Sequence, residues 1–184
     1  MNLKIIENLK NINLNKKNLL MLTGSVLLCL SAGLIGKLVV SEESLIWYEY
    51  LFKPALTPTD WLFQGVWVIL YLLMGVSLYL VLQKDSPVSK KFALIIFGSQ
   101  LLLNILWVPI FFGLRSTLGG FVISILMWIS LYLMLYKFYK ITIPAALLII
   151  PAVLWSAYFV GLNLTFWMLN NTQWILWSFK HNLL

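Results

Sequence analysis

Three stretches of the chain place large aromatic rings and side-chain amides at helical spacing. Trp67 and Tyr71 lie four residues apart, which puts them on one face of a helix. Two further faces combine rings with amides, and they consist of Gln100, Asn104, Trp107 and Phe111, and of Trp155, Phe159, Leu162 and Phe166 with Asn163 at the edge. Together such faces can enclose a flat hydrophobic ligand and supply polar anchors. The alternative is a packed core in which Asn104 bonds to a neighbouring helix.

The residues that conventional catalysis needs are scarce. Cys29 is the only cysteine and His181 the only histidine, which leaves no disulfide, thiolate metal site or histidine cluster within one chain. The last four apolar segments contain no Asp, Glu, Lys, Arg or His in their interiors, so proton relays and paired carboxylates are not predicted there. We therefore predict no metal, no required cofactor and no conventional enzyme.

The elements that must position these faces are membrane-spanning helices. The chain has 184 residues, of which 61% are hydrophobic and 10% charged, and its mean hydropathy is +0.92. These values lie outside the range of soluble domains. Because about 20 apolar helical residues cross a bilayer, we predict an all-α integral membrane protein, a five-transmembrane-helix bundle with spans at 18–40, 61–82, 92–114, 117–136 and 141–169.

The ends and the breaks between the spans are polar. Residues 1–17 are predicted to form a polar extension, 18–169 the membrane domain and 170–184 an interfacial tail. A cleaved signal peptide is the less favoured interpretation of the first span, whose apolar run is long for one. The breaks fall at 41–60, at 83–91, around Arg115 and at the KFYK segment 137–140. In the first loop, Thr57 is expected to cap the second span, with Pro58 at its first position and Asp60 favouring the helix dipole.

The net charge of +7 is distributed as a topology signal. A five-span topology puts most lysines on one side, namely Lys4, Lys10, Lys16, Lys17, Lys84, Lys90, Lys91, Lys137 and Lys140. The other side holds Lys37, Lys53, Arg115 and Lys180, so the N-terminus is predicted inside and the C-terminus outside. Lys37 is expected to snorkel to the interface. No basic and aromatic residues alternate in a soluble patch, so nucleic-acid binding is not predicted.

Four motif blocks occur in collinear order between residues 20 and 170. They are WYxxLxKPxxxP followed by Trp61, GVWxxLYxxMGxxxYLV, LNxxWxPIFFGxR ending at Arg115, and PxxxWxAxxxxLNxxxW starting at Pro151. Together they resemble the translocator protein family, also called tryptophan-rich sensory proteins or peripheral benzodiazepine receptors. A match of several blocks of Trp, Pro and Asn is far more specific than any single motif.

The resemblance implies a dimeric five-helix bundle in a membrane, here expected to be the bacterial cell membrane. It also implies a pocket below the first loop that binds porphyrins, haem-like tetrapyrroles and synthetic isoquinoline or benzodiazepine ligands. The positions that correspond to the family's pocket are Tyr48, Trp67, Tyr71, Asn104, Trp107, Trp155 and Phe159. Bacterial relatives degrade protoporphyrin in light, with two tryptophans implicated, and Trp67 and Trp155 match them.

The chain departs from the family pattern at several positions. Thr59 replaces the second of two prolines, Ile123 stands where many members have Asp, with Ser124 adjacent, and Phe159 is large where relatives are small. Leu164 and Met168 stand where the sterol-recognition pattern needs a Tyr and a basic residue, so sterol binding through it is not predicted.

The residues and what the resemblance implies leave three functions open. The first is a tetrapyrrole receptor, sensor or carrier with porphyrin or haem as ligand, in which Lys53 and Arg115 contact the propionates. The second is light-dependent porphyrin degradation through Trp67 and Trp155. The third is a membrane protein that regulates a partner. The expected partners are a hydrophobic small molecule, the lipid bilayer and a second copy of the chain.

Overall fold

The computed structural model describes residues 15–86 and 89–181, without the side chains of Lys37 and of 172–181. The regular secondary structure of the described residues is all helical, with no strand among them. The helices are α2 (Lys16–Lys37), α3 (Glu42–Tyr50), α4 (Asp60–Gln83), α5 (Lys90–Val108), the π-helix η1 (Pro109–Gly113), α6 (Thr117–Ile141) and α7 (Ile143–His181). Five segments among them are long and apolar enough to cross a membrane, which confirms the predicted fold class.

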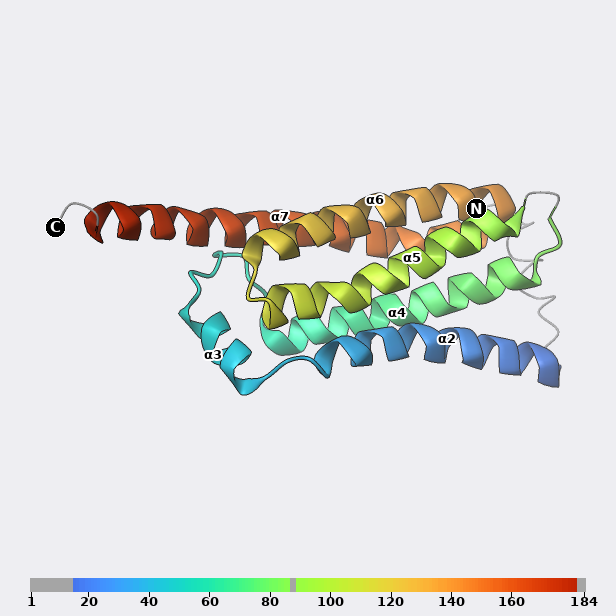
Figure 1. Cartoon of the computed structure of the whole chain (residues 1–184). Helices are drawn as coiled ribbons and strands as arrows, with labels where there is room; N and C mark the ends of the chain where they lie inside the picture. The colour runs from blue at the N-terminus through green and yellow to red at the C-terminus, as the bar shows by residue number, and fades with distance from the viewer. Residues whose placement is uncertain (1–14, 87–88, 182–184) are drawn as a thin grey trace.

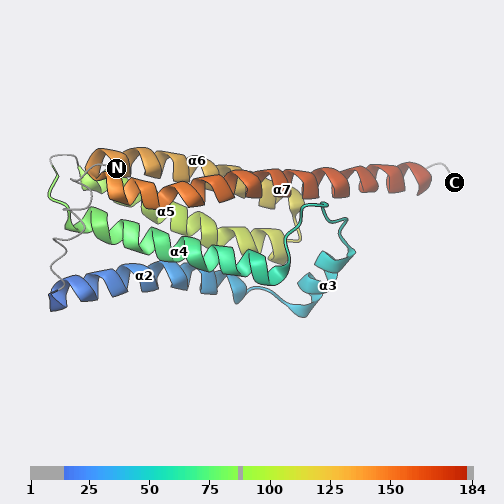
Figure 2. The same ribbon diagram turned by 180° about the vertical axis from the view of Figure 1, so that it is seen from behind.

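The long helices lie side by side in one bundle (Figures 1 and 2). α2 packs on α4 and α5, α6 packs on α5 and α7, and α4 also contacts α7. The short helix α3 sits at the end of the bundle where α2 finishes, and the C-terminal part of α7 projects past the other helices (Figure 1). The segment predicted as a tail, 170–184, is therefore helical as far as His181. Residues 1–14 and 182–184 lie outside the described residues.

The predicted break between the fourth and fifth spans does not lie at the KFYK segment 137–140. α6 does not stop at Tyr136 but continues through KFYK to Ile141, and Thr142 alone separates it from α7. The last turn is amphipathic, because Phe138 is buried in the core while Lys140 on the same turn is exposed. A pair of lysines therefore marks the membrane interface here, rather than a break in the helix.

The first loop contains a short helix, α3, that was not predicted from the sequence. α3 begins with a reciprocal capping box between Ser41 and Ser44, and Glu42 and Glu43 fill its first turn. α4 begins at Asp60, as the dipole argument expected, but Thr57 does not cap it. The N-cap is Thr59, whose side chain makes no capping bond, and the Thr57 hydroxyl instead donates to the Pro54 carbonyl at 2.7 Å. The capping prediction is wrong because a turn within the loop already uses Thr57.

Glycines allow the helices that form the site to approach closely. A Cβ on Gly33 of α2 would lie 2.6 Å from the Tyr71 ring, and one on Gly75 of α4 would lie 2.6 Å from the Val26 backbone. Gly36 likewise faces Val108, whereas nothing lies within 4 Å of the Cβ position at Gly98. Gly33 and Gly36 are therefore used for packing inside the bundle.

A candidate ligand-binding site

An aromatic cluster fills the end of the bundle below α3. The π-helix η1 begins at Pro109, whose carbonyl accepts a hydrogen bond from the Leu114 N–H at 2.9 Å across a wide turn. Phe111 within that turn is buried and stacks on Trp107, with ring centroids 4.9 Å apart and planes at 16°. Phe159 of α7 lies 4.9 Å from Trp107 and 5.5 Å from Trp67. Rings from three spans thus meet at one place.

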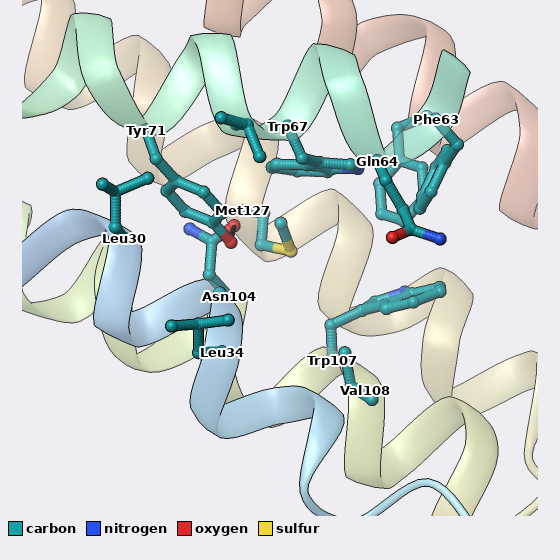
Figure 3. A pocket seen from close by; sticks show the side chains of 13 residues that line it. Leu30, Leu34, Phe63, Gln64, Trp67, Tyr71, Asn104, Trp107, Val108 and Met127 are labelled. Carbon is teal, nitrogen blue, oxygen red and sulfur yellow. Dashed lines mark hydrogen bonds between the residues drawn. The ribbon is translucent and has the colours of Figure 1, made fainter. Parts of the chain in front are cut away.

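An inner cavity of about 300 Å³ lies beside this cluster. The rings of Trp67 and Trp107 face it from opposite sides, with Tyr71 toward one end and Gln64 toward the other (Figure 3). The remaining lining is apolar apart from Asn104, and it comes from Leu30, Gly33, Leu34, Phe63, Val68, Val108, Met127 and Phe159. A slot between two indoles suits a flat ligand, because aromatic faces stack on planar rings.

The inner cavity has a polar pair at one end. The Tyr71 hydroxyl donates to Asn104 Oδ1 at 3.3 Å, and Asn104 Nδ2 donates to the Gln100 carbonyl at 2.8 Å. Asn104 therefore bonds to a neighbouring helix, as the packed-core alternative required, and also lines a cavity. Gln100 itself is fully buried and lines neither cavity described here.

An outer cavity of about 450 Å³ adjoins the inner one below α3 and the first loop. Phe63, Gln64, Trp107 and Val108 line both cavities, so these side chains separate and join them. The other lining residues are Val40, Leu45, Tyr48, Thr57, Pro58, Asp60, Phe111, Phe112, Leu162, Asn163 and Phe166. Asp60 is the one charged residue among the described residues that line the two cavities.

Trp107 is held in a fixed orientation at the junction. Its Nε1 donates to the Gly120 carbonyl at 3.1 Å and to Asn163 Oδ1 at 3.2 Å. Asn163 Nδ2 in turn donates to the Phe159 carbonyl at 2.8 Å. A Cβ on Gly120 would lie 2.5 Å from the Phe111 ring, so a larger residue there would displace that ring. The indole face, and not its N–H, is available to a ligand.

The loop 51–59, which contributes Thr57 and Pro58 to the outer cavity and is called its roof, is hydrogen-bonded to α7. Asn170 Oδ1 accepts the Phe52 N–H at 3.0 Å, and Asn170 Nδ2 donates to the Phe52 carbonyl at 3.2 Å. Tyr158 adds a bond of 2.6 Å from its hydroxyl to the Leu56 carbonyl. The loop 51–59 is thereby latched to α7 at two points.

Tyr48 lies under this roof with its ring 5.5 Å from Phe112 and 5.9 Å from Phe166. Burial raises the pKa of the Tyr48 hydroxyl above its ordinary value, and the nearby carboxylate of Asp60 raises it further. Tyr48 therefore presents a neutral ring and hydroxyl to the outer cavity.

Six of the seven predicted pocket residues line the cavities: Tyr48, Trp67, Tyr71, Asn104, Trp107 and Phe159. Trp155 lines neither. Its ring packs 6.3 Å from Phe63 and 5.0 Å from Tyr158, so Phe63 occupies the place beside the cavity that was expected for Trp155.

The two cations predicted to contact propionates also lie outside the cavity walls. Lys53 Nζ sits 4.6 Å from the centre of the Tyr48 ring, which itself lines the outer cavity. Arg115 Nη2 lies 3.5 Å from Glu43 Oε2, and both groups are exposed. Lys53 is therefore separated from the outer cavity by the Tyr48 ring, whereas Arg115 forms an ion pair with Glu43 of α3.

Several lining residues were not among the seven predicted positions, and Phe63, Gln64 and Met127 are three of them. Phe63 and Gln64 precede Trp67 by four and three residues, so extending its helical face backward would have found them. Met127 lies one turn after Ile123 and had no polar or aromatic signal. The Ser124 hydroxyl donates to the Phe121 carbonyl of its own helix, and Ser124 lines neither cavity.

Comparison with known proteins agrees with this architecture. The model of the TspO/MBR family matches residues 25–168. The chain is 36% identical over 155 residues to the tryptophan-rich protein TspO of Chlorobaculum tepidum, covering 84% of this chain and 98% of that protein. It is 34% identical to the TspO of Archaeoglobus fulgidus, covering 83% and 99%. It is 33% identical to the human translocator protein, covering 74% and 82%. The chain therefore belongs to the TspO/MBR family, as its four motif blocks indicated.

Proposed function

We propose that the protein is a membrane receptor or carrier that binds tetrapyrroles and other flat hydrophobic ligands in the two adjoining cavities. The observation that carries this proposal is the shared wall: Phe63 and Trp107 line both cavities. One planar ligand can therefore stack in the inner cavity and extend into the outer one. The volumes of about 300 and 450 Å³ fall within the usual range of ligand pockets, roughly 300–1,000 Å³.

The charges support one orientation of a tetrapyrrole. The inner cavity has no charged lining residue, so the apolar edge of the macrocycle belongs there. The propionates then point toward the loop, where Lys53 lies against the Tyr48 ring. Asp60 in the outer wall repels them, which favours a position beside Lys53 over one beside α4.

Dark titration with protoporphyrin, followed by the porphyrin absorption band, tests the site. Trp107→Leu is expected to weaken binding about tenfold or more, because it removes the stacking face common to both cavities. Trp128→Leu is the matched control, since Trp128 is exposed on α6 and lines neither cavity. Equal affinities of the Trp107→Leu and Trp128→Leu variants would contradict the proposal.

A second titration tests the propionate contact. Lys53→Ala is expected to weaken protoporphyrin binding and reduce its salt dependence, while leaving the uncharged dimethyl ester unaffected. Lys91→Ala, which removes an exposed charge at the opposite end of the bundle, is the control. An equal loss for acid and ester would show that Lys53 acts through the fold.

The photochemical alternative has weaker support. Trp67 lines the inner cavity, but Trp155 is separated from it by Phe63. Illumination of the bound complex tests this function, because Trp67→Phe and Trp155→Phe should abolish light-dependent product while sparing dark binding. The homodimer rests on the family resemblance alone, and the regulatory function is the alternative in which the cavities are incidental.

The bundle's charges support the predicted orientation in a bacterial cell membrane. Lys16 starts α2, Lys90 and Lys91 start α5, and Lys137 and Lys140 lie in the last turns of α6, all at one end (Figures 1 and 2). By the positive-inside rule this end faces the cytoplasm, and the ligand cavities lie near the opposite face.

A further inference from the structure

A separate groove lies on the surface of the bundle, away from the inner and outer cavities. It has a volume of about 360 Å³ and lies between the last turns of α6 and the first turns of α7. Its walls include Tyr132, Tyr136 and Tyr139 from α6 and Ile143, Leu147 and Ile150 from α7. It shares no lining residue with the inner or outer cavity.

Two lysines do not line this groove themselves but lie close to its wall residue Tyr136. Lys140 Nζ lies 5.5 Å and Lys137 Nζ 5.8 Å from the centre of the Tyr136 ring. Neither forms an ion pair with a carboxylate of the described residues. Four of the described acidic residues, Glu42, Glu43, Glu49 and Asp60, belong to α3 and the start of α4 at the far end of the bundle, which leaves Asp85 near this end.

The length of α6 places the lysines at the headgroup level. Its 25 residues span roughly 38 Å at about 1.5 Å each, which exceeds the hydrocarbon thickness of about 30 Å. The last turn therefore lies in the interface, where tyrosines and lysines are favoured, while the Leu147 and Ile150 side of the groove extends into the hydrocarbon. The groove thus has an apolar trough, and two cations lie beside its wall residue Tyr136.

We propose that this groove binds one anionic phospholipid of the bilayer. An acyl chain lies along the trough between α6 and α7, and the phosphate is held by Lys137 and Lys140, with the tyrosine hydroxyls as donors beside it. Basic pockets between transmembrane helices recognise anionic headgroups in this way, because their charge is attractive at short range in the low-dielectric interface. Zwitterionic lipid fills the trough without the net charge and binds less tightly.

Native mass spectrometry of the delipidated full chain, titrated with phosphatidylglycerol or phosphatidylcholine, tests the proposal. One phosphatidylglycerol is expected to bind about tenfold more tightly than phosphatidylcholine, since two lysines act on the extra charge. The double variant Lys137→Gln/Lys140→Gln is expected to lose this preference. The control Lys84→Gln/Lys91→Gln removes the same charge at the same end of the bundle, outside the groove, and is expected to retain it.

A third variant tests the trough. Leu147→Trp places a larger side chain at an exposed position of the groove wall and is expected to weaken binding of both lipids. Unchanged helical circular dichroism and protoporphyrin affinity would show that each variant is folded. The proposal is overturned if wild type shows no preference for phosphatidylglycerol, if both double variants lose it equally, or if Leu147→Trp binds both lipids as wild type does.

Discussion

The Tyr71 hydroxyl of α4 donates a hydrogen bond of 3.3 Å to Asn104 Oδ1 of α5 at the wall of the inner cavity. Gly33 of α2 packs closely against the Tyr71 ring. Three spans therefore contact the Tyr71 side chain, so the packing of these helices also determines the shape of the inner cavity.

The Tyr71–Asn104 bond is predicted to contribute to both stability and ligand affinity. Tyr71→Phe leaves a buried amide oxygen without its donor, which costs about 1–3 kcal/mol in the free energy of unfolding. Thermal unfolding in detergent of Tyr71→Phe, Asn104→Ala and the double variant measures the coupling between the two residues. Additive losses would show that the bond itself contributes nothing.

Gly33 is predicted to be required for the position of Tyr71. Gly33→Ala places a methyl group 2.6 Å from the phenol ring and is expected to lower both the melting temperature and porphyrin affinity. Gly24→Ala on the same helix meets nothing within 4 Å, so it is expected to be neutral or to stabilise by about 1 kcal/mol through helix propensity. Similar behaviour of the two variants would refute this role of Gly33.

Asn163 is predicted to act on the ligand through Trp107. Asn163→Leu removes one of the two acceptors of the indole N–H, so Trp107 can rotate and porphyrin affinity is expected to fall about tenfold. The control is Thr165→Val on the same helix, because the Thr165 hydroxyl bonds only to the Gly161 carbonyl of its own helix. The measurement is the dissociation constant for protoporphyrin. An unchanged value for Asn163→Leu would contradict a role of Asn163 in holding Trp107.

Asn170 is predicted to hold the roof of the outer cavity closed. Asn170→Ala removes both bonds to the Phe52 backbone, so amide exchange in the loop 51–59 is expected to accelerate. Asn171→Ala changes the same residue type at an exposed neighbouring position and serves as the control. Hydrogen exchange followed by mass spectrometry measures both variants, and equal loop protection would exclude the latch.

Tyr48 is predicted to make the docking of α3 sensitive to alkaline pH. Because burial and Asp60 raise its pKa in the folded protein, folding favours the neutral phenol. Its contribution to stability is therefore fully present below its ordinary pKa of 10.0 and is lost as the pH rises above that value toward the folded pKa. Unfolding between pH 9 and 12 should show a steeper loss in wild type than in Tyr48→Phe, and parallel curves would contradict this prediction.

The local part of the architecture could be predicted from the sequence alone. Helix length and composition define the five spans, because each backbone amide in a bilayer must bond within its own helix. Helical periodicity also selected Trp67 and Tyr71 on one helix and Asn104 and Trp107 on another, since residues on one face are determined within a few turns.

Tertiary structure decided which of these faces meet. Trp155 and Phe159 share a helical face, but Phe63 of α4 packs against Trp155. Of the two α7 residues, Phe159 alone therefore lines the inner cavity. The roof latch from Asn170 to Phe52 joins residues that are 118 positions apart. The lipid groove exists because α6 and α7 pack as neighbours. Periodicity determines the face on which a side chain lies, but the packing of the helices determines what that face contacts.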